Sequence, residues 1–438
     1  MSIQLFTQHS LKTVGSIPLP ILTNPFPKRT PVPKEFILNL NLEQCVCQLK
    51  SPFLLERIHV VNMLLVCSVH ECLRGDVGEL FETILTVLQD YLQDESETIV
   101  PFKHLKELEI DRNQQGIQIE ATSDIPLETT LEAEIIFGLA VFLRNVVFNR
   151  DVQRWITLNP RFVNDILPKL FTIGASSPHS SVYRPLEHRK NAITLLSSIA
   201  QFLDMGAKTD KNESIVIKEA LKVFFTALID VMDQNDLYSG LALETLVKLS
   251  SFFENREAVL ELSPSDLDKL IRVCAEMLPI TEDMSLSAIY EQASLASTAA
   301  DIWANWEFAS MILNHLAAME IQSVYIRIMT SLDSTLPILL IAIAEWGGSL
   351  TNMISNSAMH LRAKLAQLFQ PYVLEMVQRL SLRSILILES LIEGFEPSRE
   401  RLKREEQRFM GLVLAGQPTQ TILTEIGRHA AECLSFLV

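Results

Sequence analysis

The chain has 438 residues, of which 48% are hydrophobic and only 14 are glycine. Its formal net charge of −16 repels phosphate backbones and anionic lipid headgroups, so we expect no direct binding of nucleic acid or of a membrane surface. Leucine, isoleucine, alanine and glutamate dominate the local composition, and a helix accommodates such residues at low entropic cost. The composition therefore predicts an all-α fold.

Neither a secretory signal nor a membrane span is predicted. The first residues lack the charged start, apolar core and cleavage site of a signal peptide. The longest apolar run, from Leu336 to Ala344, is shorter than the roughly 20 residues that a span needs. The six cysteines lie mostly in apolar runs, as Cys67 and Cys274 do, where a reduced thiol behaves as a small hydrophobic side chain. We therefore expect a reducing compartment, cytosol or nucleus.

The N-terminal segment is rich in proline. Six of the 19 prolines lie between residues 18 and 33, and proline removes a backbone donor and biases the preceding residue away from helix. We therefore predict a flexible segment over 1–35, followed by one helical-repeat domain over 36–438. Polar loop insertions are expected within this domain near 93–126, 174–185 and 206–213.

Apolar side chains at 3.6-residue spacing predict amphipathic helices along the rest of the chain. Leu131, Ile135, Leu139, Phe142 and Val146 share one side of a helix predicted over 129–148. A second stripe predicts a helix over 237–254 and consists of Leu237, Leu241, Leu246, Leu249 and Phe253. A third stripe follows a cap-like Ser265. Similar patterns predict helices over 53–70, 77–92, 186–204, 214–233, 286–318, 322–346, 358–369, 372–394, 398–414 and 419–437.

Three segments, 143–160, 194–205 and 245–262, show a loose internal periodicity. Each is an apolar helix that ends in a polar turn, and in the first and third a short helix and then a longer one are expected to follow. A repeat of about 40 to 50 residues with this order is typical of armadillo-type helical solenoids. We therefore predict an armadillo-like α-α superhelix, with an irregular helical bundle as the alternative.

Several segments resemble the C-terminal armadillo-like core of the large ARID-containing subunits of SWI/SNF-class chromatin remodellers. The strings LRNVVFNRDVQRWITLNP (143–160), HRKNAITLLSSIAQFLDM (188–205) and GLALETLVKLSSFFENREAVLEL (240–262) are similar to that core, as are residues 42–68, 76–92 and 398–438. The resemblance runs in the same order from about residue 40 to the end. The ARID itself, a DNA-binding module, is absent from these residues, so its role is not carried over.

This resemblance implies a nuclear, non-catalytic scaffold that binds the remodelling ATPase and the scaffold subunits of the same complex. The alternative from another class is an armadillo adaptor that reads linear peptides in nuclear transport or signalling.

No motif for catalysis or for a cofactor is present in the sequence. Phosphate-binding glycine loops, H-E-x-x-H and G-x-S-x-G are all absent, and Cys45, Cys47, Cys67 and Cys72 do not form a C-x-x-C pair. We therefore expect no enzymatic activity, no cofactor and no metal.

Six residues are candidates for protein contacts. Armadillo grooves often hold a peptide backbone with asparagine, which points to Arg144 and Asn145. The structural alternative is that Asn145 bonds to a neighbouring helix and that Arg144 caps helix carbonyls. Arg401 and Arg404 belong to a basic run that alternates with glutamates, as a solvated helix face does. Trp303 and Trp306 would anchor a partner if exposed, and otherwise belong to the core.

Overall fold

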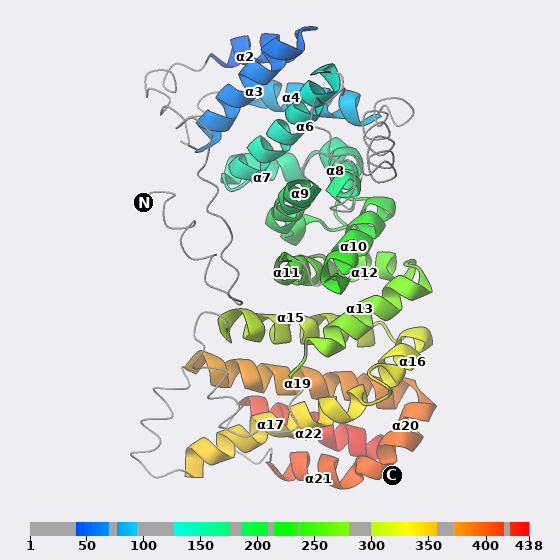
Figure 1. Cartoon of the computed structure of the whole chain (residues 1–438). Helices are drawn as coiled ribbons and strands as arrows, with labels where there is room; N and C mark the ends of the chain where they lie inside the picture. The colour runs from blue at the N-terminus through cyan, green and yellow to red at the C-terminus, as the bar shows by residue number, and fades with distance from the viewer. Residues whose placement is uncertain are drawn as a thin grey trace, which may run out of the picture. The chain divides into compact units, whose positions relative to one another are not determined.

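The computed structural model (Figure 1) describes residues 41–69, 77–93, 127–174, 185–208, 214–234, 237–279, 299–356, 371–415 and 421–437. Within these ranges the chain is helical, apart from turns and one isolated antiparallel bridge between Lys208 and Ser214. The all-α prediction is thus confirmed. None of the helices in the described ranges is long and apolar enough to cross a membrane. The predictions for 1–35, for 358–369 and for most of 93–126, 174–185 and 206–213 lie outside these residues, as does the first part of the helix predicted over 286–318.

Six long helices, which we call row one, pack against one another in chain order. Each member contacts the next, although one or more other helices lie between them in the sequence (Figure 1). Row one consists of α3 (Leu54–Val69), α6 (Leu127–Val146), α9 (Pro185–Ile199), α11 (Ser239–Ser250), α15 (Ala299–Ala317) and α19 (Pro371–Gly394).

A second set of helices, row two, covers one side of row one and also follows chain order. Each of its members contacts the next, and in chain order they pack on α6, α9, α11 and, for the last two, α15. Row two consists of α4 (Gly78–Gln93), the continuous π- and α-helical pair η2 (Phe162–Ile166) and α8 (Leu167–Gly174), α10 (Lys218–Asp233), α13 (Pro264–Glu276) and α16 (Gln322–Thr330). The short α2 (Leu42–Leu49) packs on α3 and α4.

Short segments connect the rows at three places: α7 (Arg150–Thr157), η3 (Ala200–Phe202) and α12 (Phe253–Leu260). The order of a long, a short and a second long helix was expected at the first and third of these places, and the structure has it at both. Row-one helices begin at 127, 185, 239 and 299, so their starts lie more than 50 residues apart. This spacing is wider than the expected 40 to 50 residues.

The C-terminal helices form a closely packed group around α19. Both α17 (Leu336–Asn356) and α22 (Thr421–Leu437) pack against α19, and α21 (Glu406–Ala415) packs against both of them. The helix α20 (Glu396–Leu402) and the 3-10 turn η4 (Lys403–Glu405) connect α19 to α21.

Apolar stripes account for the core. Ile135, Leu139 and Phe142 are fully buried on α6, as the periodicity predicts. Gly138 lies on the same helix, where an added Cβ would be 2.3 Å from Val61 Cγ1 of α3. Any larger residue would therefore push α3 and α6 apart.

Two predicted helices are each divided in the structure. The segment 322–346 breaks after α16 because Leu332, Asp333 and Ser334 all have left-handed backbone conformations, with φ of 51°, 53° and 68°. No glycine marks this turn, but Pro337 near the start of α17 suits a first helical turn and not a helix interior. The segment 398–414 is divided into α20, η4 and α21.

The boundary of the second stripe was also wrong. Leu237 is 95% exposed and α11 begins only at Ser239, while Phe253 is exposed at the start of α12. Ser263, and not Ser265, caps α13, because its hydroxyl accepts a hydrogen bond from the Asp266 amide and Pro264 occupies the first turn.

Candidate interaction surface along row one

Side-chain hydrogen bonds join every consecutive pair of row-one helices, and we call this series the polar ladder. In the first step, Asn145 Nδ2 of α6 donates to Ser68 Oγ of α3 at 3.0 Å. In the second step, Arg144 donates to Asn191 Oδ1 of α9 at 2.7 Å and to Asn145 Oδ1 at 2.9 Å. Arg144 and Asn145 are thus brought together with partners on both neighbouring helices.

These contacts can be compared with the two interpretations of Arg144 and Asn145. Asn145 holds a neighbouring helix, as its structural alternative predicts, while Arg144 binds two amide oxygens and not the helix carbonyls that were expected. Both side chains are half-buried, and burial lowers the pKa of the Arg144 guanidinium. Their polar groups are engaged within the fold, so a partner would meet a surface whose polar groups are already satisfied.

The middle of the ladder joins α9, α11 and α15. Lys248 of α11 donates to the Ser197 carbonyl at 3.1 Å and to the Ser197 hydroxyl at 3.2 Å. Ser250, at the end of α11, lies 2.9 Å from His315 Nδ1 on α15. Burial, with Arg256 and Arg383 nearby, lowers the pKa of His315 to about 4, so the imidazole is neutral at pH 7.

The ladder becomes ionic toward the C-terminus. Arg383 of α19 lies 3.2 Å from Glu307 Oε1 of α15, and Arg379 lies 3.6 Å from the same oxygen. Glu307 and Arg383 are both largely buried, so this pair is less screened by water than the more exposed pair of Lys269 and Asp230 between α13 and α10 in row two.

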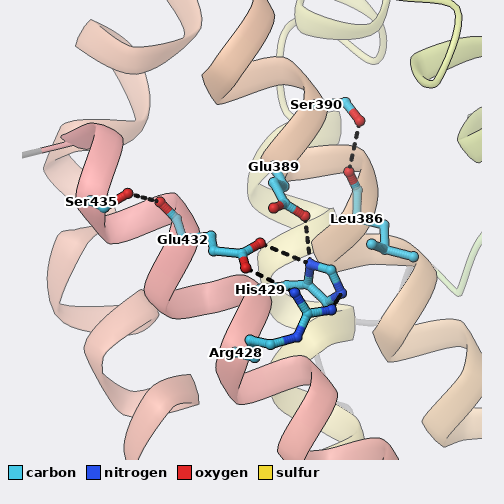
Figure 2. A network of polar contacts seen from close by, with 7 residues as sticks. All are labelled: Leu386, Glu389, Ser390, Arg428, His429, Glu432 and Ser435. Carbon is cyan, nitrogen blue, oxygen red and sulfur yellow. Dashed lines mark hydrogen bonds and ion pairs between the residues drawn. The ribbon is translucent and has the colours of Figure 1, made fainter.

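Beyond row one, α19 is joined to α22 through a cluster of four ionisable groups (Figure 2). His429 Nδ1 lies 2.6 Å from Glu389 Oε2 and 3.4 Å from Glu432 Oε2. Burial and the neighbouring Glu432 raise the pKa of Glu389 to about 8, while burial and Arg428 lower the pKa of His429. The two carboxyl groups therefore lie so close together that ionisation of one disfavours ionisation of the other.

The two tryptophan candidates differ in exposure. Trp306 is buried and packs edge-on against Trp346 of α17, with ring centroids 6.1 Å apart, so it belongs to the core. Trp303 is half-exposed one turn earlier on α15. Phe308 and Met311 on this helix are also half-exposed, and we call these three residues the α15 apolar face.

The basic run makes tertiary contacts that its sequence did not predict. Arg401 donates to the backbone carbonyls of Met329 and Ser334, at the turn between α16 and α17. Arg408 reaches Glu345 on α17, and Arg399 donates to the last carbonyls of α19. Both candidates are exposed, as a solvated face predicts, although Arg401 also makes these tertiary contacts.

Exposed aromatic residues also recur where row-one helices end. Phe148 follows α6, Phe202 follows α9 and Phe253 follows α11, with exposed fractions of 70%, 45% and 62%. Sequence reasoning treated Phe253 as a core residue and did not single out the other two. Single exposed hydrophobic side chains are common on protein surfaces, so it is the recurrence at helix ends that makes these three residues candidates for protein contacts.

The four cysteines that were considered as metal ligands differ in burial. Cys45 and Cys67 are buried, Cys47 is exposed, and Cys72 lies outside the described residues. Burial, with Cys67 nearby, raises the pKa of the Cys45 thiol to about 11, so it remains protonated at pH 7.

Sequence reasoning missed the Glu389, His429 and Glu432 cluster. A signal existed in part, because His429 and Glu432 are separated by three residues and so share one face of a helix. Glu389 lies 40 residues earlier and has no local feature that distinguishes it from other helical glutamates.

No protein-family profile matches this chain, and no curated protein sequence shows significant similarity to it.

Proposed function

We propose that this chain is a non-catalytic scaffold with an armadillo-like helical-repeat architecture, and that it serves in a SWI/SNF-type chromatin-remodelling complex. Its role would be to connect the remodelling ATPase with other core subunits in the nucleus.

The observation that carries the scaffold proposal is the packing of two rows of helices in chain order. Such packing is typical of helical-repeat proteins, in which each repeat contacts mainly its neighbours. The polar ladder adds an ordered set of contacts between consecutive repeats, which favours a rigid body.

The surface of row one supports a role in protein binding. The α15 apolar face and the exposed Phe148, Phe202 and Phe253 provide large side chains of the kind that anchor partner proteins. The net charge of −16 favours protein partners over nucleic acid for this segment.

The assignment to a remodelling complex rests on the resemblance of residues 40 to 438 to the core of the ARID-containing subunits. The test is affinity purification of the tagged chain from nuclear extract, followed by mass spectrometry. We expect a remodelling ATPase and scaffold subunits of the same complex to be recovered. Recovery of other nuclear proteins without any remodelling ATPase would contradict the assignment.

A pair of matched variants would locate the binding surface. Met311→Asp alters the α15 apolar face, whereas Ile326→Asp places the same charge on an exposed position of α16 in row two. We expect only the first variant to lose the co-purified partners, with both retaining the wild-type melting temperature. Equal recovery with both would exclude this face as the docking surface.

The peptide adaptor predicts a different result. It would bind isolated short basic peptides in a fluorescence anisotropy titration, and Met311→Asp would weaken that binding. A complex subunit is expected instead to self-associate when purified without its partner chains.

A further inference from the structure

Three potential metal ligands converge where α22 packs against α19. Glu389 extends from α19, and His429 and Glu432 extend from successive turns of α22 toward it (Figure 2). One ligand atom from each residue lies within 4.8 Å of the other two. The site is built on two long helices in close contact, so its ligands are held by the fold and not by a loop.

Their distances approach those of a tetrahedral zinc site. Zinc binds imidazole nitrogen and carboxylate oxygen at about 2.0–2.2 Å, so neighbouring ligand atoms lie roughly 3.3–3.6 Å apart. The 3.4 Å between His429 Nδ1 and Glu432 Oε2 already has this value. The 2.6 Å between His429 Nδ1 and Glu389 Oε2 is a hydrogen-bond length and must increase by less than about 1 Å, which a side-chain rotation provides.

The donor set selects among metals. One imidazole and two carboxylates suit a divalent first-row transition ion, whereas Mg²⁺ and Ca²⁺ prefer oxygen ligands alone. Two ionised carboxylates also match the charge of a divalent ion. Three protein ligands would leave a fourth position for water or for a side chain of a partner.

Arg428 competes with a metal for the same groups. Its Nη1 lies 2.8 Å from Glu432 Oε1, and its Nη2 lies 2.7 Å from His429 Nε2. Because guanidinium only donates, His429 Nε2 accepts and the ring proton resides on Nδ1, which faces Glu389. Metal binding would move this proton to Nε2 and displace Arg428, whose side chain is 58% exposed and therefore free to enter water.

We propose that Glu389, His429 and Glu432 bind a divalent first-row transition ion, represented by Zn²⁺, which fastens α22 to α19. This inference is independent of the proposed function, because it concerns the attachment of the C-terminal helix and not the identity of partner proteins.

The test is isothermal titration of the chelator-treated full chain with zinc chloride under reducing conditions, with the melting temperature measured in parallel. We expect one saturable site that His429→Gln and Glu432→Gln each weaken at least about tenfold, together with loss of the zinc-dependent rise in melting temperature. Glu432 is partly exposed, so its substitution tests the site even if His429→Gln does not fold. His59→Gln, on an exposed position of α3, is the control and should bind as the wild type does.

For Arg428→Gln we expect the opposite effect on zinc affinity. Removal of the competing guanidinium should tighten zinc binding several-fold, whereas a zinc site at the cysteines would be unaffected. Zinc affinity and stoichiometry that are the same in the wild type, His429→Gln and Glu432→Gln would overturn the proposal. So would an absence of saturable binding in the wild type.

Discussion

Two junctions between long helices, one within row one and one between row one and the C-terminal group, are built from different chemistry. At the junction of α6 and α9, the Arg144 guanidinium donates to the uncharged side-chain oxygens of Asn145 and Asn191. At the junction of α19 and α22, Glu389 and Glu432 lie with His429 and Arg428 in one cluster. Both junctions join long helices, but only the second places two carboxyl groups together.

This difference determines how each junction responds to its surroundings. Arg144 keeps its charge at all ordinary pH values, and amides do not titrate, so these hydrogen bonds remain the same. The C-terminal cluster must be neutralised by a proton, by Arg428 or by a cation. The Arg144 contacts are therefore independent of pH, whereas the C-terminal cluster responds to the pH and to cations in the solution.

The largest expected effect comes from a charge buried in α11, which lies between the two junctions in the sequence. Leu246 of α11 is 1% exposed, so Leu246→Asp buries an unpaired carboxylate and should lower the free energy of unfolding by about 4 kcal/mol or more. Thermal melting followed by circular dichroism would measure this loss. Leu237→Asp, at an exposed position, is the control and should melt as the wild type does.

Next in size is the loss of the Arg144 contacts. Arg144→Leu leaves the oxygens of Asn145 and Asn191 without their donor and should cost about 2–3 kcal/mol, equally at pH 6 and pH 9. Urea unfolding at both pH values would test this, with the exposed Arg404→Leu as the control. A cost that changes with pH would remove the contrast between the junctions.

Acid should weaken the α6–α9 region through a neighbouring group. His188 of α9 is buried edge-on against Phe137, and burial lowers its pKa to about 4. The unfolded chain binds a proton at this histidine near pH 6.5, whereas the folded protein binds it only near pH 4. The contribution of His188 to the free energy of unfolding is therefore complete above pH 6.5 and is lost as the pH falls toward 4. We expect a loss of about 2 kcal/mol, which His188→Leu should abolish in urea unfolding at pH 7 and pH 4.5.

Alkali should destabilise the C-terminal junction, which is the opposite direction of pH dependence. The pKa of Glu389 is raised from 4.5 to about 8, so the folded protein retains a proton that the unfolded chain has lost between these values. Stability therefore falls as the pH rises through this range. In a chelating buffer, the wild type should lose more melting temperature between pH 6 and pH 9 than Glu389→Gln does; equal losses would contradict this assignment.

The sequence predicted helices well wherever the apolar stripe was long. The stripe of α6 placed Ile135, Leu139 and Phe142 in the core because 3.6-residue periodicity reports directly which face is buried. The break between α16 and α17 was missed because Leu332, Asp333 and Ser334 lack the glycine that usually marks left-handed backbone. Periodicity alone cannot detect a turn that tertiary contacts impose.

The candidate site was predicted only in part. Arg144 and Asn145 were found because they are adjacent and polar at the end of an apolar helix. Their partners Ser68 and Asn191 lie 77 and 47 residues away from them. Pairing across such distances depends on which helices become neighbours, and that information is absent from local spacing.

The contacts of Arg401 affect the order in which this part of the structure can form during synthesis. The turn that Arg401 holds, from Met329 to Ser334, precedes it by about seventy residues and contains three successive left-handed residues. A left-handed conformation costs roughly 1–2 kcal/mol for each such residue, so the turn gains its support only after α20 has left the ribosome. During synthesis, α16 and α17 are therefore expected to emerge before the residue that fixes the angle between them.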